Sequence, residues 1–116
     1  MDTKLPDWAF GMNCAVTVCD ADCRIIYMNE RSRATFAARG GASLIGHNLM
    51  EYHNERSKEI IHHLLESGGT NCYTIEKAGV RKMIYQTAWR QDDGTVGGLV
   101  EISMIIPDSL PHYIRE

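Results

Sequence analysis

The sequence has no hydrophobic run long enough to cross a bilayer, which takes roughly 20 consecutive apolar residues. It also has no excess of positive charge, because 12 lysines and arginines are outnumbered by 15 aspartates and glutamates and the formal net charge is -3. A general nucleic-acid binder, or a protein held on anionic lipid, needs a basic patch. We therefore expect neither membrane association nor nucleic-acid binding.

The N-terminus lacks the pattern of an export signal, because Asp2 and Pro6 interrupt it before its first apolar stretch. We expect a cytoplasmic protein whose four cysteines are free thiols in a reducing compartment. The early cysteines Cys14, Cys19 and Cys23 also lack the paired C-x2-C spacing of zinc and iron–sulfur sites. The sequence therefore predicts no metal site built from cysteine.

Catalytic signatures are missing as well. No G-x-S-x-G, H-E-x-x-H or phosphate-binding loop occurs, and the acidic residues are scattered over expected turns and helix ends. A pair of Cys72 with His53 stays open, although nothing in the spacing indicates it. We expect a protein that is not an enzyme.

The residues that are present suit one globular domain, since 116 residues with 44% hydrophobic and 23% charged side chains are close to the average for such domains. Residues 14–20 and 24–29 predict two strands joined by the turn "DADC". Helices are expected over 30–41 and 55–69, both ending at paired glycines. Three further strands are expected over 71–77, 80–90 and 95–106. The order predicts an α+β fold with helices covering one face of an antiparallel sheet.

Three segments in this order resemble a PAS domain over about residues 14–106: "VTVCDADCRIIYMNERSRATF", "LIGHNLMEY" and "DDGTVGGLVEISMII". The resemblance implies a five-stranded sheet in the order 2-1-5-4-3, with the central helices enclosing a pocket. It also implies a flanking helix over 1–13, a PAS domain over 14–106 and a tail over 107–116. Cys23 departs from the pattern, because the first PAS hairpin commonly has glycine there.

The resemblance implies a stand-alone bacterial sensor or signal-transduction module that acts through a separate downstream protein. A small organic ligand, aromatic or fatty, is favoured; a haem or metal sensor that uses His53 is the alternative. Flavin is disfavoured because no N-C-R-F-L-type stretch occurs. A ligand-free dimerisation module is the remaining alternative, and in either case we expect a homodimer. The cue for dimerisation is the helical spacing of Leu5, Trp8, Ala9 and Met12, as in flanking helices that cap the sheet or pair with a second copy.

Four of the five histidines fall between Leu44 and Gly69. His62 and His63 flank the polar side of the long helix in opposite directions, so they cannot grip one ion together. We expect His47 at the surface after Gly46. His53 stays open as a pocket residue: its imidazole could hydrogen-bond a ligand, cap the helix or bind haem iron. The position of the haem-binding histidine in oxygen-sensing PAS domains corresponds here to about Ser57.

The remaining pocket candidates come from the strand pattern. Met83, Tyr85 and Trp89 share one face of their strand, and the other face is polar, so we expect these three to point toward the helices. Ordinary core packing is the alternative explanation of the same alternation. The predicted ligand-binding residues are His53, Asn29, Tyr52, Ser57, Ile61, Tyr73, Met83 and Tyr85.

Overall fold

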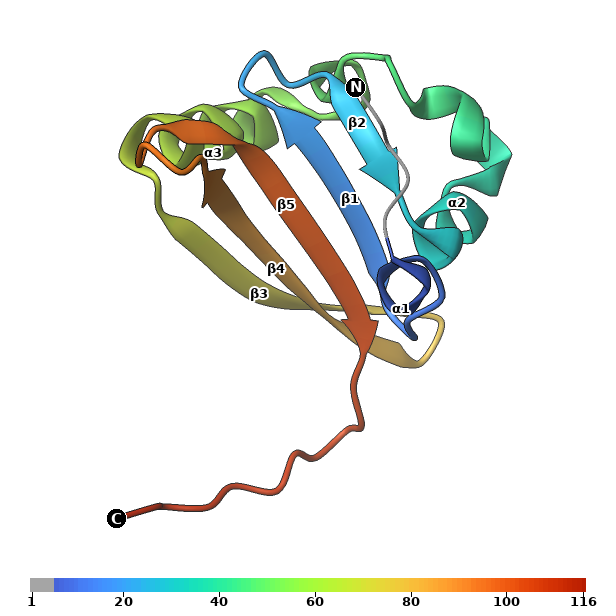
Figure 1. Cartoon of the computed structure of the whole chain (residues 1–116). Coiled ribbons are helices and arrows are strands. Elements are labelled where there is room, and N and C mark those ends of the chain that lie inside the picture. The colour runs from blue at the N-terminus through green and yellow to red at the C-terminus, as the bar shows by residue number, and fades with distance from the viewer. Residues whose placement is uncertain (1–5) are drawn as a thin grey trace.

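The computed structural model describes residues 6–116 (Figure 1). Helices are α1 (Asp7–Phe10), α2 (Glu30–Thr35) and α3 (Glu55–Ser67), with short 3-10 turns η1 (Ala37–Arg39), η2 (Gly41–Leu44) and η3 (Leu49–Tyr52). Strands are β1 (Ala15–Asp20), β2 (Ile25–Met28), β3 (Thr70–Lys77), β4 (Val80–Arg90) and β5 (Val96–Ile105). Within this part of the chain no helix is both long and apolar enough to cross a membrane.

The five strands form one antiparallel sheet in the order β2-β1-β5-β4-β3, which confirms the order that the resemblance to PAS domains implies. Helices α2 and α3 and the 3-10 turns between them lie on one side of this sheet, and α1 lies on the other side near the start of β1 (Figure 1). We call the first side the helix-facing face and the second side the outer face.

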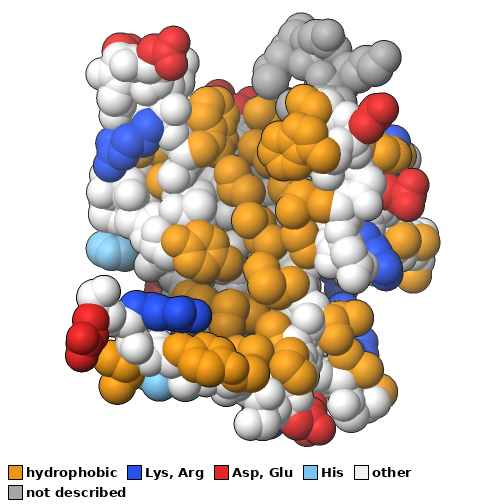
Figure 2. All heavy atoms as spheres, turned by 60° about the horizontal axis from the view of Figure 1, so that its bottom comes forward, with side chains coloured by type: hydrophobic (Ala, Val, Ile, Leu, Met, Phe, Trp, Pro, Cys, Tyr) orange, Lys and Arg blue, Asp and Glu red, His pale blue; other side chains and the backbone are white. Residues whose placement is uncertain are grey.

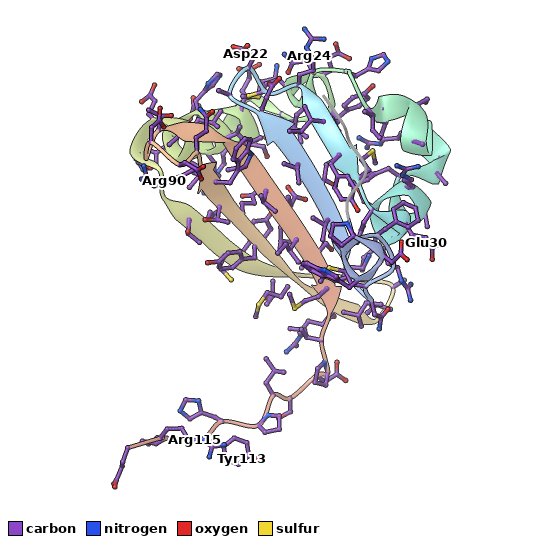
Figure 3. All side chains as sticks on the ribbon, in the orientation of Figure 1. Asp22, Arg24, Glu30, Arg90, Tyr113 and Arg115 are labelled. Carbon is purple, nitrogen blue, oxygen red and sulfur yellow. The ribbon has the colours of Figure 1, made fainter. Side chains whose placement is uncertain are left out.

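The turn between β1 and β2 explains the unusual cysteine of the first hairpin. Cys23 adopts the left-handed conformation, with φ of 64°, which favours glycine. The Asp20 side chain stabilises the turn, because its Oδ1 accepts hydrogen bonds from the backbone N–H groups of Asp22 and Arg24 (Figure 3), both at 3.0 Å. This side chain allows the tight turn to form without a glycine.

Helix α3 begins and ends at the residues that the sequence indicates. Its N-cap is Asn54, whose side chain accepts a hydrogen bond of 2.8 Å from the backbone N–H of Ser57. Gly68 ends it in the left-handed conformation. Ile61 and Leu64 are buried against Leu99 of β5 and against two cysteines of the first hairpin, which anchors α3 over the sheet.

The structure corrects the predicted orientation of β4. Leu99 faces α3 and pairs with Ala88, so the helix-facing positions of β4 are the even-numbered ones. Met83, Tyr85 and Trp89 therefore lie on the outer face, and the prediction that they point toward the helices is wrong. The prediction fails because the outer face of the neighbouring strand is also apolar, with Val100, Ile102 and Met104 beside them.

The paired glycines of β5 leave room for Trp89. A Cβ atom on Gly97 or Gly98 would collide with its indole ring. The ring lies across β5, and its Nε1–H donates a hydrogen bond of 3.0 Å to the carbonyl oxygen of Cys19 on β1. Trp89 thus joins three neighbouring strands on the outer face.

The predicted flanking helix over residues 1–13 is, in the described part of the chain, the single turn α1. Leu5, the first residue of its predicted apolar spacing, lies outside the described residues. Trp8 of α1 is 73% exposed, whereas Ala9 is buried and its carbonyl oxygen accepts a hydrogen bond of 3.2 Å from Asn29 Nδ2. Asn29 therefore ties α1 to the sheet.

Candidate functional site

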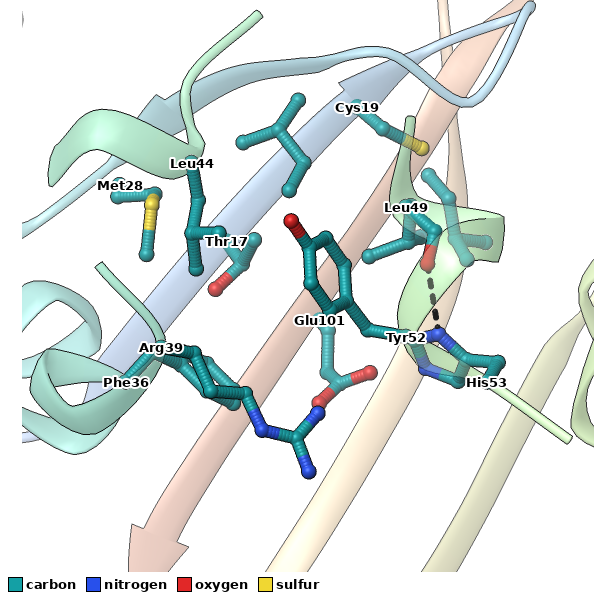
Figure 4. A pocket seen from close by; sticks show the side chains of 12 residues that line it. Thr17, Cys19, Met28, Phe36, Arg39, Leu44, Leu49, Tyr52, His53 and Glu101 are labelled. Carbon is teal, nitrogen blue, oxygen red and sulfur yellow. Dashed lines mark hydrogen bonds between the residues drawn. The ribbon is translucent and has the colours of Figure 1, made fainter. Parts of the chain in front are cut away.

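A cavity of about 150 Å³ lies between the helix-facing face of the sheet and the turns η1, η2 and η3 (Figure 4). It is lined by Thr17, Cys19, Ile25, Met28, Phe36, Arg39, Leu44, Leu49, Tyr52, His53, Leu99 and Glu101. Strands β1, β2 and β5 supply one wall, and the segment that connects α2 with α3 supplies the other. The cavity thus lies between the sheet and the central turns, the region in which the resemblance to PAS domains implies a pocket.

A second hollow of about 240 Å³ adjoins the cavity and shares Thr17, Phe36 and Glu101 with it. It lies beneath β3 and β4, where Tyr73 and Ile75 are more than 40% exposed on the helix-facing side. We call the cavity of about 150 Å³ the inner cavity or inner chamber, and the hollow of about 240 Å³ the outer hollow or outer chamber.

The inner cavity is mostly apolar. Ile25, Met28, Leu44 and Leu99 are each at most 5% exposed, and they contribute hydrocarbon and thioether surface. An apolar cavity of about 150 Å³ accommodates a benzene-sized molecule. The inner chamber thus suits one ring or one branched aliphatic group.

His53 has a fixed tautomer. Its Nδ1 lies 2.8 Å from the carbonyl oxygen of Leu49 (Figure 4). A carbonyl oxygen only accepts, so Nδ1 carries the hydrogen, and in the neutral imidazole Nε2 holds a free lone pair. The turn η3 sets this position, and Asn48 caps it by accepting a hydrogen bond of 2.8 Å from the backbone N–H of Met50. His53 therefore brings a hydrogen-bond acceptor to the cavity wall.

Glu101 is held at the junction of the two chambers by a row of polar side chains across the sheet. Gln86 Nε2 donates to its Oε2 at 3.1 Å, and Asn71 Nδ2 donates to Gln86 Oε1 at 3.0 Å. Burial raises the pKa of Tyr73 above its usual value, and the negative charge of Glu101 raises it further. Glu101 is thus held in a fixed position, and its negative charge acts on Tyr73 in the outer chamber.

Arg39 brings positive charge to the same cavity from the end of η1. Figure 4 shows its side chain and that of Glu101 at the same end of the pocket, away from Leu44 and Met28. Arg39 is exposed, so its guanidinium is hydrated where it approaches the cavity.

Two predicted site residues, Tyr52 and His53, line the inner cavity, and Tyr73 lines the outer hollow. Ser57 and Ile61 belong to α3 outside both linings, and Ile61 is 1% exposed in the core beneath that helix. Neither residue lies where the predicted pocket needs it, because Ile61 packs directly on Leu99 of β5 and Ser57 contributes to neither lining.

Asn29 was predicted to contact a ligand, but its side chain is occupied by the protein. Its Oδ1 accepts from the backbone N–H groups of Val16 and Ser32, and its Nδ2 donates to the carbonyl oxygens of Ala9 and Cys14. It is 0% exposed. Met83 and Tyr85, on the outer face, are likewise outside the cavity.

Sequence reasoning missed Arg39, Phe36 and Glu101. Glu101 sits in a strand whose neighbours are apolar on both sides, so alternation alone assigns it to solvent. The available signal was the cross-strand register, since Glu101 pairs with Gln86, and Gln86 with Asn71. Three polar residues side by side indicate a shared network rather than three solvated side chains.

The cavity does not fit a haem group. Drug-sized ligands occupy pockets of roughly 300–1,000 Å³, and the inner cavity is half the lower value. His53 offers Nε2 as an axial ligand, but the cavity beside it, walled by the buried Leu44 and Leu99, is too small for the macrocycle. In residues 6–116 no three His, Cys, Asp or Glu side chains gather in a way that could hold a metal ion.

Neither Cys19 nor the other three histidines of this segment add a reactive group to the cavity. Burial raises the pKa of Cys19 to about 12, so its sulfur lines the cavity as a neutral thiol rather than a nucleophilic thiolate. His62 and His63 are exposed on α3, and His47 is exposed beside Glu51, with 3.9 Å between Nδ1 and Oε2. Of the four histidines in this segment, only His53 belongs to the cavity.

Solved structures of several sensory proteins have the same fold. A sensory box sensor histidine kinase from Vibrio cholerae is 16% identical with a TM-score of 0.61, over 83% of this chain and 84% of that one. The Aer2 receptor from Vibrio cholerae, described as a dual PAS-heme oxygen sensor, is 18% identical with a TM-score of 0.63, over 84% and 97%. VqmA bound to DPO is 12% identical with a TM-score of 0.66, over 86% of this chain and 55% of that one.

At these identities the structural likeness shows the fold alone. Comparison with the curated proteins finds no match to this sequence. The profile of a family described as PAS fold matches residues 10–68, more than half of the chain. This match includes the first hairpin, α2, the cavity turns and α3. PAS domains are generally sensory, non-catalytic modules of signal transduction. The chain belongs to the PAS family.

Proposed function

We propose that the chain is a ligand-sensing PAS module that binds a small molecule in the inner cavity and signals to a separate partner protein without catalysing a reaction. The observation that carries this proposal is the cavity itself, which combines an apolar lining with the free acceptor Nε2 of His53. Concave, mostly apolar sites with a few placed polar groups are typical of small-molecule binding.

The cavity supplies a route for a signal. Leu99 and Glu101 of β5 line it, while their neighbours Val100 and Ile102 lie on the outer face of the same strand. A ligand that shifts β5 therefore changes the opposite side of the sheet, where a partner has access. The turns η1, η2 and η3 form the other wall, and backbone hydrogen bonds such as Gly46 N–H to Ile25 O and Leu49 N–H to Cys23 O connect this wall to the first hairpin.

Structural relatives support a ligand-binding function without identifying a ligand. VqmA has been solved bound to DPO, and the Aer2 receptor is described as a haem oxygen sensor. The haem does not transfer to this chain, for the steric reason given above. A VqmA complex also contains DNA, but this chain spans only about half of that protein's length. We therefore propose a protein partner for this chain, not DNA.

Native mass spectrometry of freshly purified protein tests the proposal. We expect a bound small molecule, or retention of one after a ligand screen, in the unmodified protein. Leu44→Trp fills the inner cavity and abolishes retention, whereas Leu110→Trp places the same ring on the exposed tail and leaves it intact. Equal retention by both variants, or no retention by the unmodified protein, contradicts ligand sensing.

A second function, self-association through the outer face, is favoured by the exposed apolar groups there. Trp8 is 73% exposed and Tyr85 38% exposed, and hydrophobic side chains gather in a band down the view of Figure 2. We propose a homodimer formed through this face. Analytical ultracentrifugation of Trp8→Ser and Tyr85→Ser should show weaker association than Tyr113→Ser, a control on the tail. Unchanged association in the first two variants contradicts it.

We also propose that the protein works in a bacterial cytoplasm. All four cysteines are free thiols, which supports a reducing compartment. Fractionation of cells expressing a tagged full chain checks this proposal, and recovery from an exported fraction contradicts it.

A further inference from the structure

The inner cavity has charges of both signs at one end. Arg39 and Glu101 both line it, from η1 and β5 respectively (Figure 4). Among residues 6–116 neither side chain forms an ion pair with another group. A guanidinium and a carboxylate that face one small space are thus both available to a ligand.

The other end of the cavity has no charge. Its lining there comes from Ile25, Met28, Leu44 and Leu99, all buried. A ligand that satisfies both ends must join one small apolar group to a head with a cation and an anion side by side. A ligand with one charge would lack the charge-assisted hydrogen bonds to either Arg39 or Glu101 and would therefore bind less tightly.

We propose that the ligand is an amino-acid-like zwitterion of about the size of leucine. This inference rests on the proposed ligand-sensing function and specifies its chemistry. The ligand's carboxylate pairs with Arg39, its ammonium group pairs with Glu101, and its side chain enters the apolar end beside Leu44.

Each charged contact has a physical basis. The planar guanidinium of Arg39 matches a carboxylate with two parallel hydrogen bonds. Glu101 stays in place because Gln86, which is 5% exposed, donates to its Oε2, and this leaves Oε1 for the ammonium group. The lone pair of His53 Nε2, on the opposite wall of the cavity, is a second acceptor for the ammonium hydrogens.

The size of the cavity limits the ligand's side chain. The whole cavity, with its charged end included, is about 150 Å³, the size that takes one ring. The apolar end alone is smaller than this, so it suits the isobutyl group of leucine. Tryptophan, whose indole has two fused rings, should therefore bind more weakly than leucine.

Isothermal titration calorimetry of the full chain with three matched compounds tests the proposal. L-leucine has both charges, isoamylamine lacks the carboxylate, and isocaproate lacks the ammonium group. We expect leucine to bind about tenfold or more tightly than either analogue, because each lost charge-assisted hydrogen bond is worth about that factor. An analogue that equals or exceeds leucine overturns the proposal.

Two variants assign the charges. Arg39→Gln should abolish the preference for leucine over isoamylamine, and Glu101→Gln should abolish its preference over isocaproate. Arg56→Gln and Glu66→Gln, exposed charges on α3, are the matched controls and should keep both preferences. If the control variants lose the preferences as well, a general effect of charge explains the result and the proposed contacts are wrong.

Benzene separates this proposal from the proposed function. If benzene perturbs the methyl resonances of Leu44 and Leu99 but leucine does not bind, the cavity accepts ligands and the zwitterion is the wrong class. If neither compound perturbs these resonances, ligand sensing itself fails. Binding of leucine that Leu44→Trp blocks supports both proposals.

Discussion

The two faces of the sheet are both apolar, but they are built for different contacts. The helix-facing face combines buried Leu99, Cys19 and Met28 with the polar row Asn71–Gln86–Glu101, and it encloses a cavity. The outer face presents Val100, Ile102 and Tyr85 without such a row. The comparison teaches that the polar row of this sheet lies on the face that encloses the cavity, and that an apolar strand face can point away from the helices.

Asn29 connects the two faces, and replacing it should lower the free energy of unfolding more than any other substitution discussed below. Its side chain bonds β1, α2 and the α1 segment through four hydrogen bonds while fully buried. We expect Asn29→Ala to lower the free energy of unfolding by about 3–5 kcal/mol, because several buried groups lose their partners. Urea denaturation measures this. Asn13→Ala, which removes one exposed bond to Arg31, is the control and should cost well under 1 kcal/mol, roughly that of a surface change.

Truncations on the two faces test how differently they are buried. Leu44→Ala on the cavity side should cost about 2–4 kcal/mol, because Leu44 is 5% exposed in a packed cluster. Ile102→Ala on the outer face should cost about 1 kcal/mol in the monomer, since Ile102 is only half-buried. If the outer face forms a dimer, the Ile102→Ala loss grows with protein concentration. If Ile102→Ala and Leu44→Ala lower the free energy of unfolding equally at every protein concentration, the two faces are not buried differently.

The pH dependence of stability probes the cavity side alone. The pKa of Cys19 rises from 9.0 to about 12 in the fold, chiefly by burial. The unfolded chain therefore releases this proton first, so the stabilisation is complete below pH 9.0 and is lost as pH rises toward 12. The slope from this thiol is at most about 1.4 kcal/mol per pH unit. Cys19→Ala should make the decline shallower, as measured by denaturation at several pH values. An identical decline in the variant contradicts a buried neutral thiol.

The sheet order follows from the resemblance to PAS domains, and the α3 boundaries follow from Asn54 and the glycines after the helix, because caps and turn residues act locally. Tyr52 and His53 were found because they sit in the irregular wall of the pocket. The sequence could not show which side of the sheet carries Met83 and Tyr85, because that depends on how β4 pairs with its neighbouring strands and on where the helices pack. Glu101 became recognisable only through its register with Gln86.

Binding of a small molecule in the inner cavity is the central requirement for ligand sensing by this domain. Methyl NMR of the isotopically labelled full chain in benzene-saturated buffer tests this. We predict shifts at Ile25, Leu44, Leu49 and Leu99 and unchanged resonances at Val18 and Ile102 of the outer face. Shifts confined to the outer face, or none at the four cavity residues, would contradict the account.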